Sequence, residues 1–370
     1  MTKKFLLAGA SALMIAAPTM VQADEGMWLP SQTGAIADAM KAAGLELDAA
    51  TLGDLQRPPL TAIASLGGCS AAFLSPQGLV ATNHHCVAGS LQFNSSPEND
   101  YLTDGFLAKT LADELPAAPG SRIYVIEDLR DVTAAMLKGA DKLDGRARYD
   151  RLQANRTALI EACEKQANRR CDVRAYFGGA QYWLQQQLEI KDVRLVYAPA
   201  GGVGNFGGEK DNWMWPRHTG DFAFYRAYVA PDGSSAPFAK ENVPFAPKAF
   251  LPIAKEGVKD GDFIMVAGFP GTTERLRTAE EARFYYEELY PYQQRMLAEY
   301  GDRIDALTEG NQAATIAYAA TLQGVENYEK KIAGQLAGAD AISLVARKQA
   351  EEELFRAWIK ADPKREAQYG

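Results

Sequence analysis

All three histidines of this 370-residue chain lie in two short segments. The first, 82–86, reads TNHHC and follows an apolar run, and the second, 211–221, reads DNWMWPRHTGD. A histidine becomes a general base when a buried aspartate holds its imidazole in one tautomer. His85, directly before Cys86, and Asp221, at the start of an apolar run, are suited to these two roles. A fold that uses them must bring two segments that are far apart in the sequence to one place.

Both residues also have plainer interpretations. A His–His pair is typical of metal sites, so His84, His85 and His218 would suit a metal-dependent hydrolase, but no other group with ligand spacing lies nearby and we expect no metal. Neighbouring residues at a strand end point to opposite faces. We therefore expect His84 to be structural and Cys86 to be a poor nucleophile for His85. An aspartate such as Asp221, taken alone, is most often part of a β-turn.

The sequence contains no recognisable nucleophile for the base. Within the 370 residues, no serine lies in a G-x-S-G-x-P loop. The segment 233–237, GSSAP, is superficially similar, but the preceding Asp232 together with Gly233 predicts a hairpin turn instead. We therefore expect the chain to hold a general base and an orienting acid without the serine that they would activate.

The first 23 residues have the pattern of a secretory signal peptide. Lys3 and Lys4 precede an uncharged apolar run, 5–18, and a small-x-small cleavage signal that ends at Ala23. The run is shorter than the roughly 20 residues of a membrane-spanning helix, and no later stretch qualifies. The mature chain would carry a net charge of −10, because the signal removes two lysines from a total of −8. An acidic chain without a basic block is not expected to bind nucleic acid.

Four cysteines in an exported chain predict two disulfides. Three pairings are possible, and we favour Cys69 with Cys86 and Cys163 with Cys171. The first disulfide would join two strands that flank His85, and the second would join the end of a helix to the next strand.

Hydrophobic patterning predicts a β-rich unit followed by a helical unit that begins near residue 273. Short runs of alternating apolar residues, bounded by turn residues, predict strands. Between about 130 and 166 the apolar residues recur at helical spacing, which predicts a helical insert in the β-rich unit. We expect strands at 67–74, 79–82, 121–126, 172–177, 222–229 and 262–271, one long strand or two strands over 182–197, and a glycine-rich loop at 199–208.

Together these segments resemble the bacterial exported serine dipeptidyl-peptidases of the dipeptidyl-peptidase 7 and 11 type. The resemblance extends over essentially the whole chain, and its most specific part is the segment 211–221. The other stretches that carry it are 24–28, 67–70, 82–86, 205–208, 268–272. The resemblance implies a chymotrypsin-like first β-barrel over 24–272, followed by the start of a helical capping domain over 273–370. It also implies that the second barrel, with the serine, is absent from this sequence.

The resemblance implies a role for each candidate site residue. His85 matches the general base and Asp221 the orienting acid of the family. Asn212, Trp213 and Asn327 match the positions that receive the free α-amino group of a peptide. The chemistry is suitable, because amide oxygens accept hydrogen bonds from an ammonium group and an indole face attracts it.

The function implied by the resemblance is that of a periplasmic serine exopeptidase that removes dipeptides from free peptide N-termini. It needs no metal or organic cofactor, and the resemblance implies a family that tends to form homodimers at full length. Because the serine is missing, we expect the 370-residue chain by itself to be inactive. A hypothesis of a different class is a non-catalytic module that binds peptide N-termini, and binding without turnover would favour it.

Overall fold

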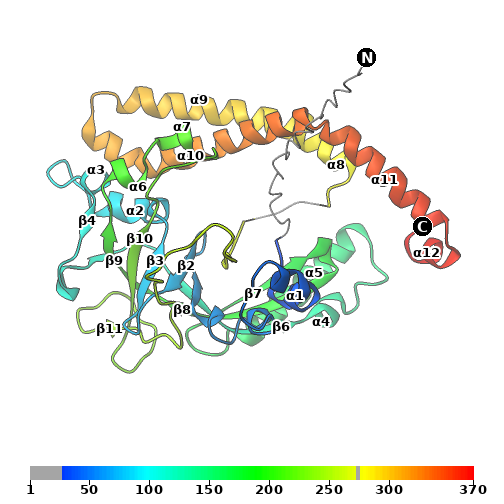
Figure 1. Ribbon diagram of the computed structural model, residues 1–370, viewed down its shortest axis with the longest axis horizontal. Coiled ribbons are helices and arrows are strands. Elements are labelled where there is room, and N and C mark those ends of the chain that lie inside the picture. Colours follow the sequence, from blue (N-terminus) through cyan, green and yellow to red (C-terminus); the bar gives the residue numbers. More distant parts are fainter. Residues whose placement is uncertain (1–26, 272–275) are drawn as a thin grey trace, which may run out of the picture.

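The computed structural model describes residues 27–271 and 276–370, and within these ranges eleven antiparallel strands form one sheet (Figure 1). The signal-peptide prediction for 1–23 and the expected domain boundary at 272/273 lie outside the described residues. The strands are β1 (Ile63–Ser65), β2 (Ser70–Phe73), β3 (Leu79–Thr82), β4 (Phe106–Leu107), β5 (Leu115–Pro116), β6 (Ile123–Asp131), β7 (Arg169–Tyr176), β8 (Gln181–Ile190), β9 (Asp192–Ala198), β10 (Ala223–Val229) and β11 (Val243–Pro244). Their order is β4-β9-β10-β3-β2-β1-β6-β8-β7, with β5 paired to β9 and β11 to β10.

Helices cover the sheet at two places and dominate the chain after residue 276 (Figure 1). The α-helices are α1 (Ala37–Ala42), α2 (His84–Asn94), α3 (Tyr101–Asp104), α4 (Thr133–Leu137), α5 (Gly145–Cys163), α6 (Gly201–Gly204), α7 (Gly208–Asp211), α8 (Ala279–Arg283), α9 (Tyr290–Thr308), α10 (Gln312–Ala341), α11 (Leu344–Lys360) and α12 (Pro363–Tyr369). A π-helical segment, Phe284–Leu289, joins α8 to α9, and short 3-10 helices span Pro30–Ile36, Thr51–Gly53, Leu60–Ala62, Leu111–Asp113 and Phe177–Gly179. Among the described residues, none of these helices is both long enough and apolar enough to cross a membrane.

The pairing of β3 with β10 brings the two histidine-containing segments together. Thr82, the last residue of β3, lies opposite Ala223, the first residue of β10. Because antiparallel neighbours run in opposite directions, the chain that leaves β3 meets the chain that enters β10. Alternate residues of β10, including Ala223 and Tyr225, are buried against a core that contains Phe73 and Val80. This register is therefore fixed by burial, since a slip of one residue would turn the core-facing residues to solvent.

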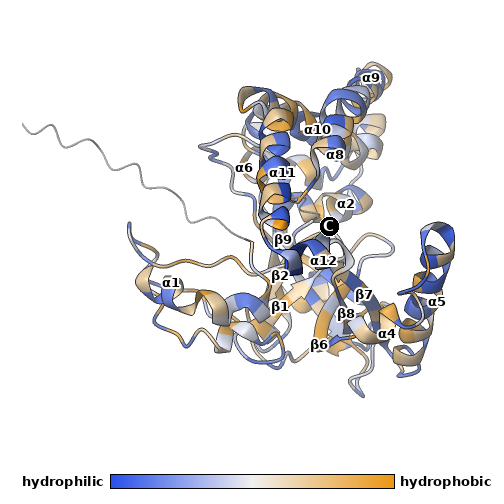
Figure 2. Cartoon of the chain, turned by 90° about the vertical axis from the view of Figure 1, so that its right-hand side faces the viewer, coloured by the Kyte–Doolittle hydropathy of each residue, from blue (hydrophilic) through white to orange (hydrophobic). Residues whose placement is uncertain are grey.

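The helical insert packs on the far end of the sheet, beside β7 and β8 (Figure 1). Met136 of α4 and Leu184 of β8 form a small apolar core there with the disulfide between Cys163 and Cys171. This disulfide joins the last residue of α5 to β7, as the sequence predicts. The rest of α5 is largely hydrophilic in Figure 2, and Cys163 is its one buried residue. The insert is held on the sheet by α4, by the C-terminal end of α5, and by Leu152 and Arg156 from the middle of α5, of which Arg156 donates to Asp172 of β7 at 2.7 Å.

Helices α9 and α10 lie antiparallel above α2, on the other side of the molecule from most of the insert (Figure 1). Gln92 of α2 makes both side-chain hydrogen bonds of this contact. Its Nε2 donates to the carbonyl of Ala317 at 2.6 Å, and its Oε1 accepts from the N–H of Ala320 at 3.2 Å. The helical unit is thereby attached directly to the helix that carries the two adjacent histidines.

A buried ion pair lies on β9. The side chain of Asp192 is 0% exposed and that of Arg194 is 9% exposed. Arg194 donates from Nε and Nη2 to the two carboxylate oxygens of Asp192, at 3.0 and 2.7 Å, and Asn242 donates to the same carboxylate at 2.9 Å. The guanidinium also stacks on Tyr228 of β10, 3.8 Å from the ring centroid. Both carboxylate oxygens of Asp192 and two of the three guanidinium nitrogens of Arg194 therefore have a protein partner.

Two segments that do not contain the histidines differ from the sequence predictions. The strand expected at 262–271 is not formed, and Ile264 and Val266 are 69% and 95% exposed. A strand needs a neighbouring strand for its backbone groups. Within the described residues this segment pairs with none: the N–H of Asp262 donates to the nearby carbonyl of Lys259 in a turn, and the N–H of Phe269 donates to Ser70 Oγ. The loop expected at 199–208 contains the helical turn α6 and the start of α7.

Candidate active site

The two adjacent histidines begin a helix, whereas the sequence predicts that they end a strand. Asn83 is the N-cap of α2, and His84, His85 and Cys86 form its first turn. Successive residues of a helical turn point in different directions, about 100° apart. His84 is consequently buried, at 5% exposure, while the side chain of His85 is 54% exposed. The expected separation of the two histidines is confirmed, although its cause is a helix and not a strand.

His85 and Asp221 are in direct contact. The ring Nδ1 of His85 lies 2.8 Å from Asp221 Oδ2, and the backbone N–H of His85 donates to Oδ1 at 3.0 Å. Burial acts to raise the pKa of Asp221, but the hydrogen bonds from the ring and backbone of His85 outweigh it and hold the pKa below its usual value. The ionised carboxylate accepts a hydrogen bond from Nδ1–H, which leaves Nε2 free to accept a proton from another group.

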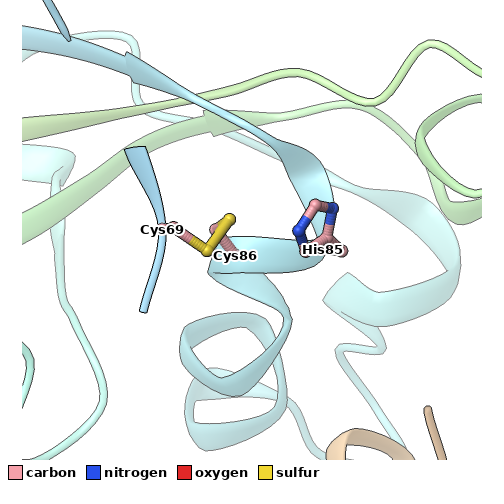
Figure 3. A group of neighbouring side chains, drawn as sticks. All are labelled: Cys69, His85 and Cys86. Atoms are coloured by element: carbon pink, nitrogen blue, oxygen red, sulfur yellow. A yellow bond between two sulfur atoms is a disulfide. The ribbon is translucent and has the colours of Figure 1, made fainter. Parts of the chain in front are cut away.

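The disulfide between Cys69 and Cys86 fixes the first turn of α2 from the other side (Figure 3). It joins the loop before β2 to this helix, not two strands as the sequence predicts, although the pairing is the predicted one. Cys69, His85 and Cys86 are the one group of described residues with metal-ligand spacing. Both sulfur atoms are joined to each other, so they are not thiolate ligands. The three histidines do not form such a group in the described structure.

His84 packs beneath α6. Its ring lies so close to Gly204 that a Cβ at that position would overlap it, and both ring nitrogens are buried without a hydrogen-bond partner among the described residues. Burial lowers the pKa of His84 below its ordinary 6.5, and the nearby charge of Asp221 opposes this only in part. His84 is therefore suited to a structural role as a neutral ring.

We expect His84 to make folding sensitive to mild acid. Below pH 6.5 the unfolded chain protonates this histidine while the folded protein, with the lowered pKa, does not, so stability falls as the pH falls. Urea unfolding of wild type and His84→Leu at pH 7.5 and pH 5.5 measures this effect. Relative to the variant, the wild type should lose at most about 1.4 kcal/mol of unfolding free energy for each pH unit that the pH falls. An equal difference at both pH values would contradict the assignment.

The three other predicted site residues also come together. Asn212 is the C-cap of α7, Trp213 follows it with a positive φ of 59°, and Asn327 lies on α10. Asn212 Nδ2 donates to Asn327 Oδ1 at 2.8 Å, and the indole Nε1 of Trp213 donates to the backbone and side-chain oxygens of Asn327, both at 3.1 Å. Trp213 is 58% exposed, so the cluster lies at the surface.

Sequence reasoning missed the residues that hold this cluster. Arg217 Nη1 donates to Asn212 Oδ1 at 2.8 Å, and Asn212 also donates to Glu209 Oε2 at 2.6 Å. Lys330 of α10 donates to the carbonyls of Glu209 and Lys210. These residues have no local signature, although Arg217 lies within the segment that sequence analysis selects. Their positions follow from the docking of α10 on α7.

Comparisons with known proteins match the chain along almost its full length. A model of the peptidase S46 family matches residues 23–370. An Asp/Glu-specific dipeptidyl-peptidase of Shewanella putrefaciens is 43% identical over 353 residues, covering 95% of this chain and 48% of its own length. Dipeptidyl-peptidase 7 of Porphyromonas gingivalis is 35% identical over 384 residues, covering 100% of this chain and 52% of its own.

The structural comparison agrees with the sequence comparison. DPP11 of Porphyromonas endodontalis, solved in complex with the dipeptide Arg-Glu, superposes with a TM-score of 0.84 at 33% identity. The match covers 91% of this chain and 50% of that protein. The chain spans about half the length of the curated relatives it matches.

Proposed function

The chain belongs to the peptidase S46 family, and from this premise we propose that it provides the general base, the orienting acid and the N-terminus-binding residues of a serine-type dipeptidyl-peptidase. The observation that carries the proposal is the contact between His85 and Asp221, which leaves Nε2 of an exposed imidazole free to act as a base. The cluster of Asn212, Trp213 and Asn327 supports it with amide oxygens and an exposed tryptophan, groups that suit an α-ammonium group.

The nucleophilic serine, in this proposal, comes from a part of the protein outside residues 1–370. Among the described residues, the hydrogen bonds of the His85 ring lead to Asp221 and to no serine. The sheet of residues 27–271 would be the first chymotrypsin-like barrel, and α8–α12 would begin the helical capping domain. The signal-peptide pattern at 1–23 supports export to the periplasm.

The proposed mechanism uses each group in turn. The α-ammonium group of a peptide binds at Asn212, Trp213 and Asn327, which places the second peptide bond at the serine. Nε2 of His85 takes the serine proton as the oxygen attacks the carbonyl carbon, and then gives it to the departing amine. Asp221 stabilises the imidazolium in between. Water, activated by the same base, hydrolyses the acyl-enzyme and releases the dipeptide.

The test is a comparison of fluorogenic dipeptidyl amides with free and with acetylated N-termini, using the intact protein that carries this chain. We expect hydrolysis of the free substrates only. A panel with acidic and apolar residues next to the scissile bond tests whether this protein shares the Asp/Glu specificity named for its Shewanella putrefaciens relative. Saturable binding of the free peptides without turnover would instead support the N-terminus-binding module.

We expect Asn327→Leu to lower kcat/KM for free dipeptidyl substrates by about 10- to 100-fold, the range for loss of a hydrogen bond to a charged group. The leucine keeps an apolar volume on α10 but removes the acceptor oxygen that organises Asn212 and Trp213. Asp340→Asn, at an exposed position on the same helix, is the matched control and should leave kcat/KM unchanged. Equal activity of Asn327→Leu and the control would exclude Asn327 from the binding site.

A further inference from the structure

The side chain of Asn83 makes two contacts that the mechanism above does not use. Its Nδ2 lies 3.1 Å from the backbone oxygen of Asp221 and 3.2 Å from Oδ2 of the same residue. Both partners are acceptors, so the amide group of Asn83 must face them with its two N–H donors. We propose that Asn83 is a positioning residue that holds the Asp221 carboxylate in the orientation from which it accepts the Nδ1–H of His85. The inference deepens the proposed function and rests on it.

The N-terminus of α2 shows that the contact between Asn83 and Asp221 is not an ordinary helix cap. An asparagine at the N-cap usually accepts a hydrogen bond from the second or third residue of the helix. Asn83 is the N-cap of α2 and makes no such bond. The N–H of His85, the second residue of α2, donates to Oδ1 of Asp221 instead. Asp221, which lies just before β10, therefore accepts the hydrogen bond that the N-cap side chain usually accepts. Asn83 in turn donates to Asp221.

The three contacts together leave the carboxylate one orientation. Oδ1 accepts from the backbone of His85, while Oδ2 accepts from the His85 ring and from Asn83. The positive end of the α2 dipole also favours an anion at this position. An orientation fixed in this way selects the imidazole tautomer with its proton on Nδ1, since only that tautomer donates to Oδ2. Loss of the Asn83 donor should therefore allow the carboxylate to turn and the other tautomer to appear.

Position 83 is suitable for substitution. Asn83 is exposed, so a change there removes little buried surface. Serine and aspartate are both good N-cap residues and preserve the helix start. Asn83→Ser shortens the side chain so that it no longer reaches Asp221, and Asn83→Asp keeps the shape but replaces the donor by an acceptor. Asn94→Ser is the matched control, because Asn94 ends the same helix and its amide also donates twice, to the carbonyls of Ser90 and Pro116.

The decisive measurement is the tautomer of neutral His85, read from the ring ¹⁵N chemical shifts of histidine-labelled intact protein. Residues 1–370 contain three histidines, and the His85→Gln variant identifies the signals of His85. We expect the Nδ1–H tautomer alone in wild type and in Asn94→Ser, and a mixture with the Nε2–H tautomer in both Asn83 variants. Unchanged shifts in Asn83→Ser would overturn the proposal. This readout needs no peptidase activity, so it fails or succeeds independently of the proposed function.

Kinetics provide the second readout. In an active enzyme we expect Asn83→Ser to lower kcat about tenfold with KM little changed, since the substrate-binding residues are untouched. Asn83→Asp should lower kcat at least as much, because it places a second carboxylate beside Asp221. Wild-type kcat in either Asn83 variant, or an equal loss of kcat in Asn94→Ser, would contradict a positioning role.

Discussion

Asp221→Asn is expected to lower kcat about 10⁴-fold in the active protein, the loss found when a triad aspartate becomes an amide. Both oxygens of Asp221 accept hydrogen bonds, Oδ1 from the backbone of His85 and Oδ2 from the His85 ring and Asn83. An asparagine has one acceptor oxygen. If that oxygen stays on the backbone N–H, its amide group faces two donors. The imidazole then favours the tautomer that carries its proton on Nε2. In that tautomer Nε2 has no free lone pair and cannot act as the general base.

The design separates this effect from a loss of folding. Asn is close to Asp in size, and the far-ultraviolet circular dichroism of the variant should equal that of wild type. Asp232→Asn is the matched control, since Asp232 occupies a surface turn where it accepts from Ser234. We expect the control to retain wild-type kcat. A loss of less than tenfold in Asp221→Asn would remove Asp221 from the catalytic pair.

Asp192→Ala is expected to lower the free energy of unfolding by about 3–5 kcal/mol, as found when one partner of a buried ion pair is removed. The change leaves the guanidinium of Arg194, 9% exposed, without its carboxylate partner. Its stacking on Tyr228 and its hydrogen bond to the carbonyl of Ala239 remain, but neither neutralises the charge. Urea unfolding at pH 7.5 measures the difference.

Two further variants test whether the cost comes from the unpaired buried charge. Asp150→Ala breaks the exposed pair between Arg146 and Asp150 and should cost at most about 0.5 kcal/mol. The double variant Asp192→Leu with Arg194→Met removes both charges and should be closer to wild type than Asp192→Ala, because no uncompensated charge remains. A cost for Asp192→Ala no larger than that for Asp150→Ala would show that water reaches the pair.

The sequence predicts this molecule best where local pattern and tertiary structure agree. The alternation in 79–82 and 222–229 predicts β3 and β10, and their pairing delivers His85 and Asp221 to one place. The pairing of the four cysteines is also predicted correctly. The two strands are predictable because the burial of one face fixes both a strand and its register.

The predictions fail where a distant partner decides the structure. The apolar segment 262–271 has strand composition, but a strand forms only beside another strand. The start of α2 was missed because its capping group, Asp221, lies far along the chain. Asn83 and Arg217 lie within the two selected segments, but their roles follow from hydrogen bonds, to Asp221 and to Asn212, that the residue pattern does not reveal.

Helix α2 is attached to both halves of the proposed site. Its first turn carries His85, and two turns later Gln92 binds the backbone of α10 at Ala317 and Ala320. Asn327 lies about two turns further along α10. The distance between the base and the residue that would receive a peptide's amino group is thus set by rigid helices and not by loops. In the proposed enzyme this distance determines the length of the product. If α10 were displaced along its axis by one helical turn relative to Gln92, the released fragment would change in size while the chemistry at His85 stayed the same.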